Sequence, residues 1–277
     1  MRPPVTAAPR IARRIDGTTK AARMVPEEAP VAFSYGGTTH AVMMATPADL
    51  EDFALGFSLT EGIVASPDEI EAIAIEEAGE GIDIQISLRD EPGARFQARR
   101  RHLAGPVGCG LCGIESIEEA LRRVPDVSSS LLSISNEDIA RSVAFLSRRQ
   151  KLHAKTGAVH AAGFYVPGQG SGSGIVAVRE DVGRHNALDK LAGALVRGGV
   201  DGASGAVVVT SRVSVEMVQK TAAIGAAVIL AVSAPTALAV RTAQEAGMML
   251  VALVRGEEFD VFTHAQRLNG QEARNVA

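Results

Sequence analysis

Residues 206–254 read AVVVTSRVSVEMVQKTAAIGAAVILAVSAPTALAVRTAQEAGMMLVALV, and short apolar runs alternate in them with longer segments. The runs have the length and composition of buried strands, and they lie at 206–210, 228–232 and 248–254. The segments between them have the length of helices, at 215–226 and 236–246. Because strands that alternate with helices form a sheet covered on both faces, the pattern predicts an α/β fold with a mainly parallel sheet.

The same alternation continues on both sides of this stretch. Two further strands, around a Gly/Ser turn, and two further helices are expected before it, at 161–166, 174–179, 138–149 and 183–196. A last strand at 259–263 is expected at an edge of the sheet. We therefore predict an α/β domain over residues 131–277.

A smaller α+β domain is predicted ahead of it, over residues 26–130. Gly36-Gly37 lies between two apolar runs, which is typical of a β-hairpin. A helix from Thr46-Pro47 to Gly62 and a second pair of strands should follow, the strands at 70–76 and 82–88. This domain ends in a cysteine loop and a helix at 116–123, and a connector rich in proline and serine separates it from the α/β domain.

The composition and charge predict a globular protein that binds neither nucleic acid nor membrane, and we expect it to be cytoplasmic. The 277 residues are 46% apolar, and a net charge of −4 gives no general attraction to polyanions. Residues 1–25 are expected to form a flexible tail, and they lack the apolar segment of a signal peptide. The uncharged stretch 221–240 is interrupted by Gly225, Ser233 and Pro235, which argues against a membrane helix.

Three turns at the expected carboxyl ends of strands carry polar groups, which is where α/β sheets bind ligands. They lie at 181–186, 210–214 and 233–236. As ligand-binding candidates we take Asp181, Arg184, His185, Arg212 and Ser214. The alternatives are an Asp181–Arg184 ion pair and simple helix capping by Ser214 and Thr236. Glu216 and Lys220, four residues apart on a helix, would form a surface pair if exposed, and we leave them outside the site.

Both cysteines of the chain lie in Gly108-Cys109-Gly110-Leu111-Cys112-Gly113. Glycine on either side of each cysteine lets other molecules approach the backbone closely. A structural zinc site would have to add histidine ligands, because there is no second cysteine pair. A thioredoxin-like redox pair would be expected in a small βαβ domain.

A zinc deaminase is a third possibility, since Pro106 precedes the cysteines and His160 begins a His-x-x sequence. The motif order is reversed, however, and Ala162 stands where that chemistry needs a glutamate. A persulfide carrier remains, and it needs a reachable, nucleophilic cysteine on a loop that can visit two partners.

The chain resembles the formate dehydrogenase accessory sulfurtransferases, the FdhD/NarQ family. The resemblance covers nearly everything after about residue 31, with several long motifs in the family's order. They are CGLCG at 109–113, TGAVHAAGF at 156–164, EDVGRHNALDK at 180–190, SRVSVEMVQK at 211–220, VSAPT at 232–236, VRG at 254–256 and VFTH at 261–264.

The resemblance implies a sulfur carrier that takes sulfur from a cysteine desulfurase and delivers it to the bis-molybdopterin guanine dinucleotide cofactor of formate dehydrogenase. It implies that Cys109 carries the persulfide and that Cys112 assists. It also implies a C-terminal domain of cytidine-deaminase-like, three-layer α/β/α architecture and a homodimer. The cofactor is bound as a substrate, and no permanent metal is expected.

The family's cofactor-binding segment falls on Leu253, Val254, Arg255, Gly256, Glu257 and Glu258. Many relatives carry a basic residue in place of Glu258 and a tyrosine in place of Phe262. Arg255 is retained, and its guanidinium can pair with a phosphate through two hydrogen bonds. The alternative function is a non-catalytic chaperone for the molybdenum cofactor, whose cysteines bind zinc or act as a redox pair.

Overall fold

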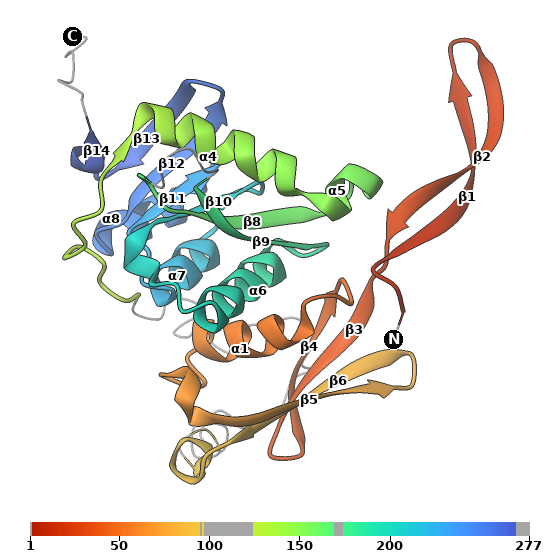
Figure 1. Ribbon diagram of the computed structural model, residues 1–277, viewed down its shortest axis with the longest axis horizontal. Helices are drawn as coiled ribbons and strands as arrows, with labels where there is room; N and C mark the ends of the chain where they lie inside the picture. The colour runs from red at the N-terminus through yellow and green to blue at the C-terminus, as the bar shows by residue number, and fades with distance from the viewer. Residues whose placement is uncertain (1, 95, 97–123, 169–173, 270–277) are drawn as a thin grey trace.

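The computed structural model describes residues 2–94, 96, 124–168 and 174–269, which form a mixed α/β structure (Figure 1). This confirms the α/β class. The described strands form a projecting two-stranded hairpin, a four-stranded sheet, a six-stranded sheet and a small two-stranded sheet. The small sheet pairs β7 (Ile134–Ser135) with β14 (Leu268–Asn269), which ties the last described residues to the start of the second half of the chain.

The four-stranded sheet forms the N-terminal core. Its order is β4-β3-β6-β5, with β3 at Ala29–Tyr35, β4 at Thr38–Ala45, β5 at Ile70–Ala78 and β6 at Gly81–Leu88. Gly36 and Gly37 have φ angles of 57° and 73°, as a tight hairpin turn requires, so the predicted hairpin is confirmed. Helix α1 (Leu50–Thr60) covers one face, where Phe33 stacks on Phe57 with ring centroids 4.1 Å apart. The 3-10 turn η1 (Pro67–Glu69) leads into β5.

The six-stranded sheet has the order β13-β12-β11-β10-β8-β9. Its strands are β8 (His160–Tyr165), β9 (Ile175–Asp181), β10 (Ala206–Val209), β11 (Val228–Ala231), β12 (Met249–Arg255) and β13 (Glu258–Thr263). The expectation of a mainly parallel sheet is wrong, because only β10–β11 and β11–β12 pair in parallel. β12 and β13 are joined by a short turn and run antiparallel, and β8 pairs antiparallel with both β9 and β10. β13 is at an edge, as predicted.

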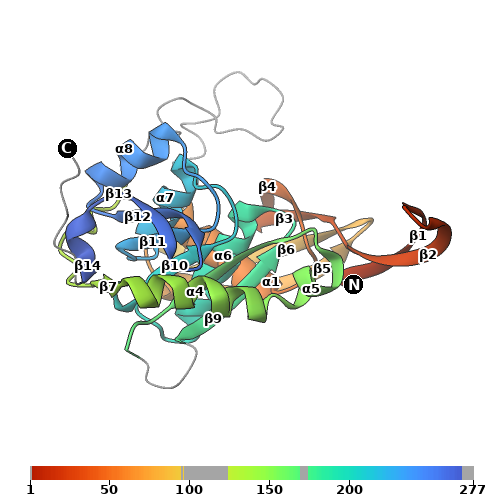
Figure 2. The same ribbon diagram turned by 90° about the horizontal axis from the view of Figure 1, so that it is seen from above.

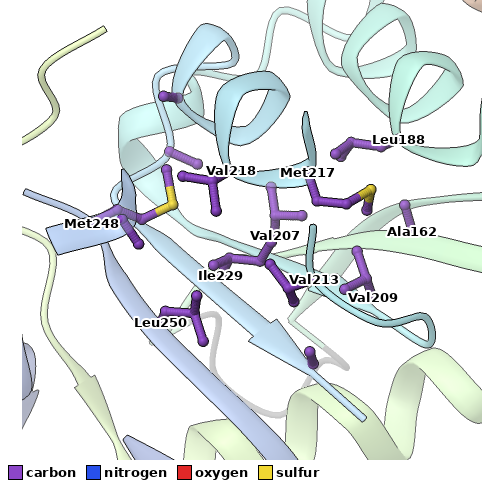
Figure 3. Packing of buried hydrophobic residues seen from close by; sticks show 14 of the residues in the cluster. Ala162, Leu188, Val207, Val209, Val213, Met217, Val218, Ile229, Met248 and Leu250 are labelled. Atoms are coloured by element: carbon purple, nitrogen blue, oxygen red, sulfur yellow. The ribbon is translucent and has the colours of Figure 1, made fainter. Parts of the chain in front are cut away.

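Helices cover both faces of this sheet (Figure 2). On one face lie α6 (Arg184–Arg197), α7 (Val215–Ala223) and α8 (Ala237–Glu245), and the 3-10 turn η2 (Gly202–Ser204) follows α6. Their apolar side chains meet those of the strands in one buried cluster, in which Leu188, Met217 and Ile229 take part (Figure 3). On the other face α4 (Asn136–Arg149) packs against the strands through Ile139 and Leu146, and α5 (Lys151–Thr156) follows it. The 3-10 turn η3 (Ala265–Arg267) precedes β14.

The two sheets are joined through a close crossing of α1 and α6. A Cβ at Gly56 would come within 1.7 Å of the Asp189 carbonyl oxygen, and one at Gly193 within 2.0 Å of the Asp52 carbonyl oxygen. Only glycine permits this approach. Hydrogen bonds of Thr46 with Asp181 and with the Val182 amide also hold the end of β9 against the segment between β4 and α1. The boundaries at residues 26, 130 and 131 and the likeness to cytidine deaminases stay predictions.

The flexible tail predicted at the N-terminus is wrong for most of its length. β1 (Val5–Arg14) and β2 (Gly17–Pro26) form an antiparallel hairpin with ten cross-strand pairs, which projects from the molecule (Figures 1 and 2). The pattern was missed because the hairpin covers no core, so its strands lack the alternation of apolar and polar residues. In the part of the chain that the structure describes, no helix is long and apolar enough to cross a membrane.

Candidate functional site

The candidate site lies at the edge of the six-stranded sheet that is formed by the ends of its strands, not along an outermost strand. β9 is antiparallel to β8, and β8 is antiparallel to β10, so the carboxyl ends of β9 and β10 meet the amino end of β8 at this edge. The turns before α6 and α7 therefore lie together, with His160 at the start of β8 beside them. The third turn, before α8, adjoins them through a bridge between Val213 and Pro235.

Asp181 supports this edge from inside the protein. Its side chain is 0% exposed, and Oδ1 accepts hydrogen bonds from the Gly183 amide (2.7 Å) and from Nδ2 of Asn186 (3.0 Å). Oδ2 accepts from the Thr46 amide (3.0 Å) and from Nζ of Lys190 (2.6 Å). These four donors occupy the carboxylate, so Asp181 holds the turn before α6 against the N-terminal half.

Arg184 and Ser214 start the two helices that point at the site. α6 begins at Arg184 after Gly183, and α7 begins after Ser214, and among the described residues no side chain caps the first turn of either helix. Uncapped amides and the helix dipole favour an anion at such positions. Nε of Arg184 is buried without a hydrogen-bond partner in the described structure. Thr236, by contrast, caps α8 by accepting from the Ala239 amide at 3.2 Å.

His185 joins the two helix starts. Its Nε2 lies 2.9 Å from Oε2 of Glu216 and 3.4 Å from Oγ of Ser214. The hydrogen bond from His185 lowers the pKa of Glu216 to about 2. Sequence reasoning placed Glu216 outside the site, although an acidic residue two positions after Ser214 is well placed for a partner at a helix start.

The edge carries excess positive charge. Burial, followed by the charges of Arg184 and Arg212, lowers the pKa of His160, so the two arginines are close enough to disfavour a further cation. Arg212 is exposed and Arg184 half-buried. The structure thus brings together four of the predicted residues, Arg184, His185, Arg212 and Ser214, around a place suited to an anionic group.

Lys220 does not form a surface pair with Glu216. It is 4% exposed, and its Nζ lies 2.7 Å from Oδ1 of Asp189 and 2.5 Å from Oε1 of Glu61. Burial alone would lower the pKa of Lys220, but the charges of Asp189 and Glu61 raise it. Lys220 is therefore a buried cation that ties α7 to α6 and to the end of α1.

The predicted cofactor segment covers the end of β12, the turn after it and the first residue of β13. Leu253 has a φ of 58° at an irregularity in the strand pairing, and its amide donates to the Ser233 carbonyl at 3.4 Å. Val254 is buried, and Nη1 of Arg255 donates to the carbonyls of Val232 and Val254. Arg255 therefore lies beside the turn before α8, while Gly256, Glu257 and Glu258 are exposed.

Cys109 and Cys112 lie outside the described residues. The described residues on either side of that segment are anchored in different halves of the protein. Phe96 packs against Tyr35, with ring centroids 4.9 Å apart, and Val124 packs against the cluster beneath α6, α7 and α8.

A mixed α/β protein with arginines and uncapped helix starts at one sheet edge has the features of a protein that binds an anionic ligand. The FdhD/NarQ family model matches residues 26–269, so the chain belongs to that family. Its class is thus that of the sulfur carriers associated with formate dehydrogenase.

Individual relatives agree with this membership. The sulfur carrier protein FdhD of Agrobacterium fabrum is 62% identical over 246 residues, which is 89% of both chains. That of Cupriavidus necator is 53% identical over 244 residues, 88% of this chain and 83% of the relative. A crystal structure assigned as a formate dehydrogenase accessory protein from Desulfotalea psychrophila has a TM-score of 0.75 at 25% identity, covering 96% of this chain and all of that one.

Proposed function

We propose that this chain accepts sulfur from a cysteine desulfurase as a persulfide on Cys109 and delivers it to the bis-molybdopterin guanine dinucleotide cofactor of formate dehydrogenase. The observation that carries the proposal is the match to the sulfur carrier family over residues 26–269, a range that contains both cysteines. The sulfurtransferase reaction would take place in the cytoplasm.

The first step needs only a nucleophilic cysteine. The Cys109 thiolate attacks the terminal sulfur of the donor's persulfide, and the donor's sulfur–sulfur bond breaks as the new one forms on Cys109. The donor cysteine leaves as a thiolate, so no external oxidant or reductant is consumed. Cys112 assists or relays the sulfur. Ala162 is a buried strand residue, so β8 offers no glutamate for the hydrolytic chemistry of the deaminases that its domain is proposed to resemble.

The basic edge of the sheet supports the binding of the anionic substrate. Arg184, Arg212 and the starts of α6 and α7 offer charge and backbone amides to phosphate groups. Arg255 lies on β12, four strand positions from β9, which corresponds to roughly 19 Å at about 4.8 Å per strand. An extended ligand with several phosphates, such as a dinucleotide, suits charges spread over that length.

Mass spectrometry of the intact protein tests the carrier function. After incubation with a cysteine desulfurase and cysteine, we expect the wild-type chain and the Cys112→Ala variant to gain one sulfur atom, and the Cys109→Ala variant to gain none. Sulfuration of the cofactor and activation of formate dehydrogenase by the Cys109→Ala variant would rule out the assignment of Cys109.

The same experiment separates the carrier from the alternative, a molybdenum-cofactor chaperone with a zinc or redox pair. A pure chaperone would gain no sulfur on either cysteine. Zinc in the purified protein, lost when both cysteines are replaced, would support the zinc form of the chaperone.

A further inference from the structure

The hairpin of β1 and β2, which we call the arm, is built differently from the rest of the protein. It precedes the residues that the family model matches, apart from Pro26. Almost all its side chains are at least partly exposed, including Ile11 (68%), Ile15 (110%) and Met24 (40%). An isolated two-stranded hairpin is marginally stable in water at best, so such an arm gains stability from a surface to pack against.

Among the residues that the structure describes, the side-chain hydrogen bonds between the arm and the rest of its own chain lie near the base of the arm. Nη2 of Arg23 donates to the Thr156 carbonyl at 3.0 Å, and Oγ1 of Thr6 donates to Glu27 at 2.9 Å. Beyond this base the two strands form an open hollow, and Arg10, Ile11 and Lys20 are among the residues that line it. Nε of Arg10 is shielded from solvent, and no described group accepts a hydrogen bond from it.

The charge of the arm is opposite to that of the four-stranded sheet. Residues 5–26 contain five basic residues and one acidic residue, whereas residues 70–88, which span β5 and β6, contain five acidic residues and no basic residue. Within one chain, Arg2, which precedes the arm, already pairs with Glu80, at the turn between β5 and β6. The two surfaces are therefore electrostatically complementary.

β5 also offers a fitting shape. It is the last strand of its sheet in the described structure, so one side of its backbone is available for pairing. A second open hollow runs along it, where Leu55, Ile70 and Ile73 lie beside Glu71. Arg197 also lines this hollow, but its charge is already matched by Glu51 (2.9 Å) and Asp52 (3.0 Å).

We propose that the arm docks onto the β5 hollow of a second copy of this chain, with Ile11 against Ile70 and Ile73 and with Arg10 facing Glu71. The exchange is reciprocal, so each dimer contains the contact twice and closes on itself. The proposal gives an interface to the homodimer that the family resemblance implies, and it does not depend on the proposed sulfur transfer. Oligomeric state is measured without sulfur donor or acceptor, so a failure here is distinct from a failure of the carrier function.

Sedimentation velocity of the full chain and of charge variants tests the interface. We expect a dimer whose dissociation constant rises with salt, and a rise of about tenfold or more for Arg10→Glu or Glu71→Lys, because each reversal turns two attractions into repulsions. Combining the two substitutions should restore most of the affinity. The matched controls are Arg241→Glu and Glu245→Lys, which make the same charge changes at exposed positions of α8.

Ile11→Ser should weaken the dimer without changing any charge, and circular dichroism should show all variants folded. A chain that stays monomeric at every concentration would overturn the proposal. A dimer that Arg10→Glu, Glu71→Lys and Ile11→Ser leave unchanged would overturn it as well. If these variants bound the desulfurase more weakly but still formed dimers of normal affinity, the arm would bind an acidic partner protein instead of a second copy of this chain.

Discussion

Nζ of Lys190 lies 2.6 Å from Oδ2 of Asp181, and both side chains are completely buried. The same ammonium group donates to the Thr46 carbonyl at 2.8 Å, and the same carboxylate accepts from the Thr46 amide. One ion pair therefore fixes the strand-to-helix turn at the candidate site and the entry to α1 at the same time. The geometry of the site depends on how the two halves of the chain are joined.

Replacing Lys190 with methionine should destabilise the protein by about 3–5 kcal/mol, because Asp181 would remain as a buried charge without its cation. Adding Asp181→Asn should recover part of this loss, since the remaining group is neutral. Urea unfolding followed by circular dichroism measures both effects. A loss below about 1 kcal/mol for Lys190→Met would show that the pair is not what holds the halves together.

Gly193→Ala should destabilise the crossing of α1 and α6 by about 2 kcal/mol or more, because the new methyl group would lie 2.0 Å from the Asp52 carbonyl oxygen. Gly93→Ala is the matched control, since its Cβ would meet nothing closer than 3.9 Å. Thermal unfolding of the two variants makes the comparison. Equal melting temperatures would contradict the close approach of the helices.

The hydrogen bond between His185 and Glu216 predicts a pH dependence of stability. The folded-state pKa of about 2 is below the ordinary value of 4.5, so the unfolded chain binds more protons between these values and stability falls with the pH. The stabilisation is complete above pH 4.5 and is lost as the pH approaches 2. The melting temperature of the wild type should therefore exceed that of Glu216→Gln more at pH 6 than at pH 3. A difference independent of pH would show that folding does not lower the pKa of Glu216.

Arg184→Ala should weaken the binding of guanosine diphosphate about tenfold or more, because a charge-assisted hydrogen bond contributes about 1.5–3 kcal/mol. Isothermal titration calorimetry measures the affinity, and Arg241→Ala on α8 is the control for the loss of one positive charge. Unchanged affinity for Arg184→Ala would move the phosphate site away from the start of α6.

Arg255→Lys tests whether phosphate binding at the end of β12 needs a planar guanidinium group. Lysine keeps the charge but cannot make two parallel hydrogen bonds to a phosphate, so we expect affinity for guanosine diphosphate to fall. Arg255→Ala should reduce it further. If lysine preserved full affinity, Arg255 would act only through its charge.

Local patterns in the sequence predicted most of the elements and the turns that carry the candidate residues. The Gly36-Gly37 hairpin, the helix after Thr46 and the strand-to-helix turn at Asp181 were all predicted from segments of a few residues. These predictions succeed because backbone preference and the periodicity of buried residues depend on residues that are close together in the sequence. The family motifs likewise identified the sulfur carrier family from the sequence alone.

Contacts between distant segments were decided only by the tertiary structure. Lys220 seemed a surface partner for Glu216, yet it binds Asp189, 31 residues away, and Glu61, 159 residues away. Asp181 was expected to pair with Arg184 or a ligand, but it is buried against Thr46 and pairs with Lys190. The sequence gives the charge of each side chain and its position in the chain. The burial of a side chain and its partner depend on which helices and strands pack against it.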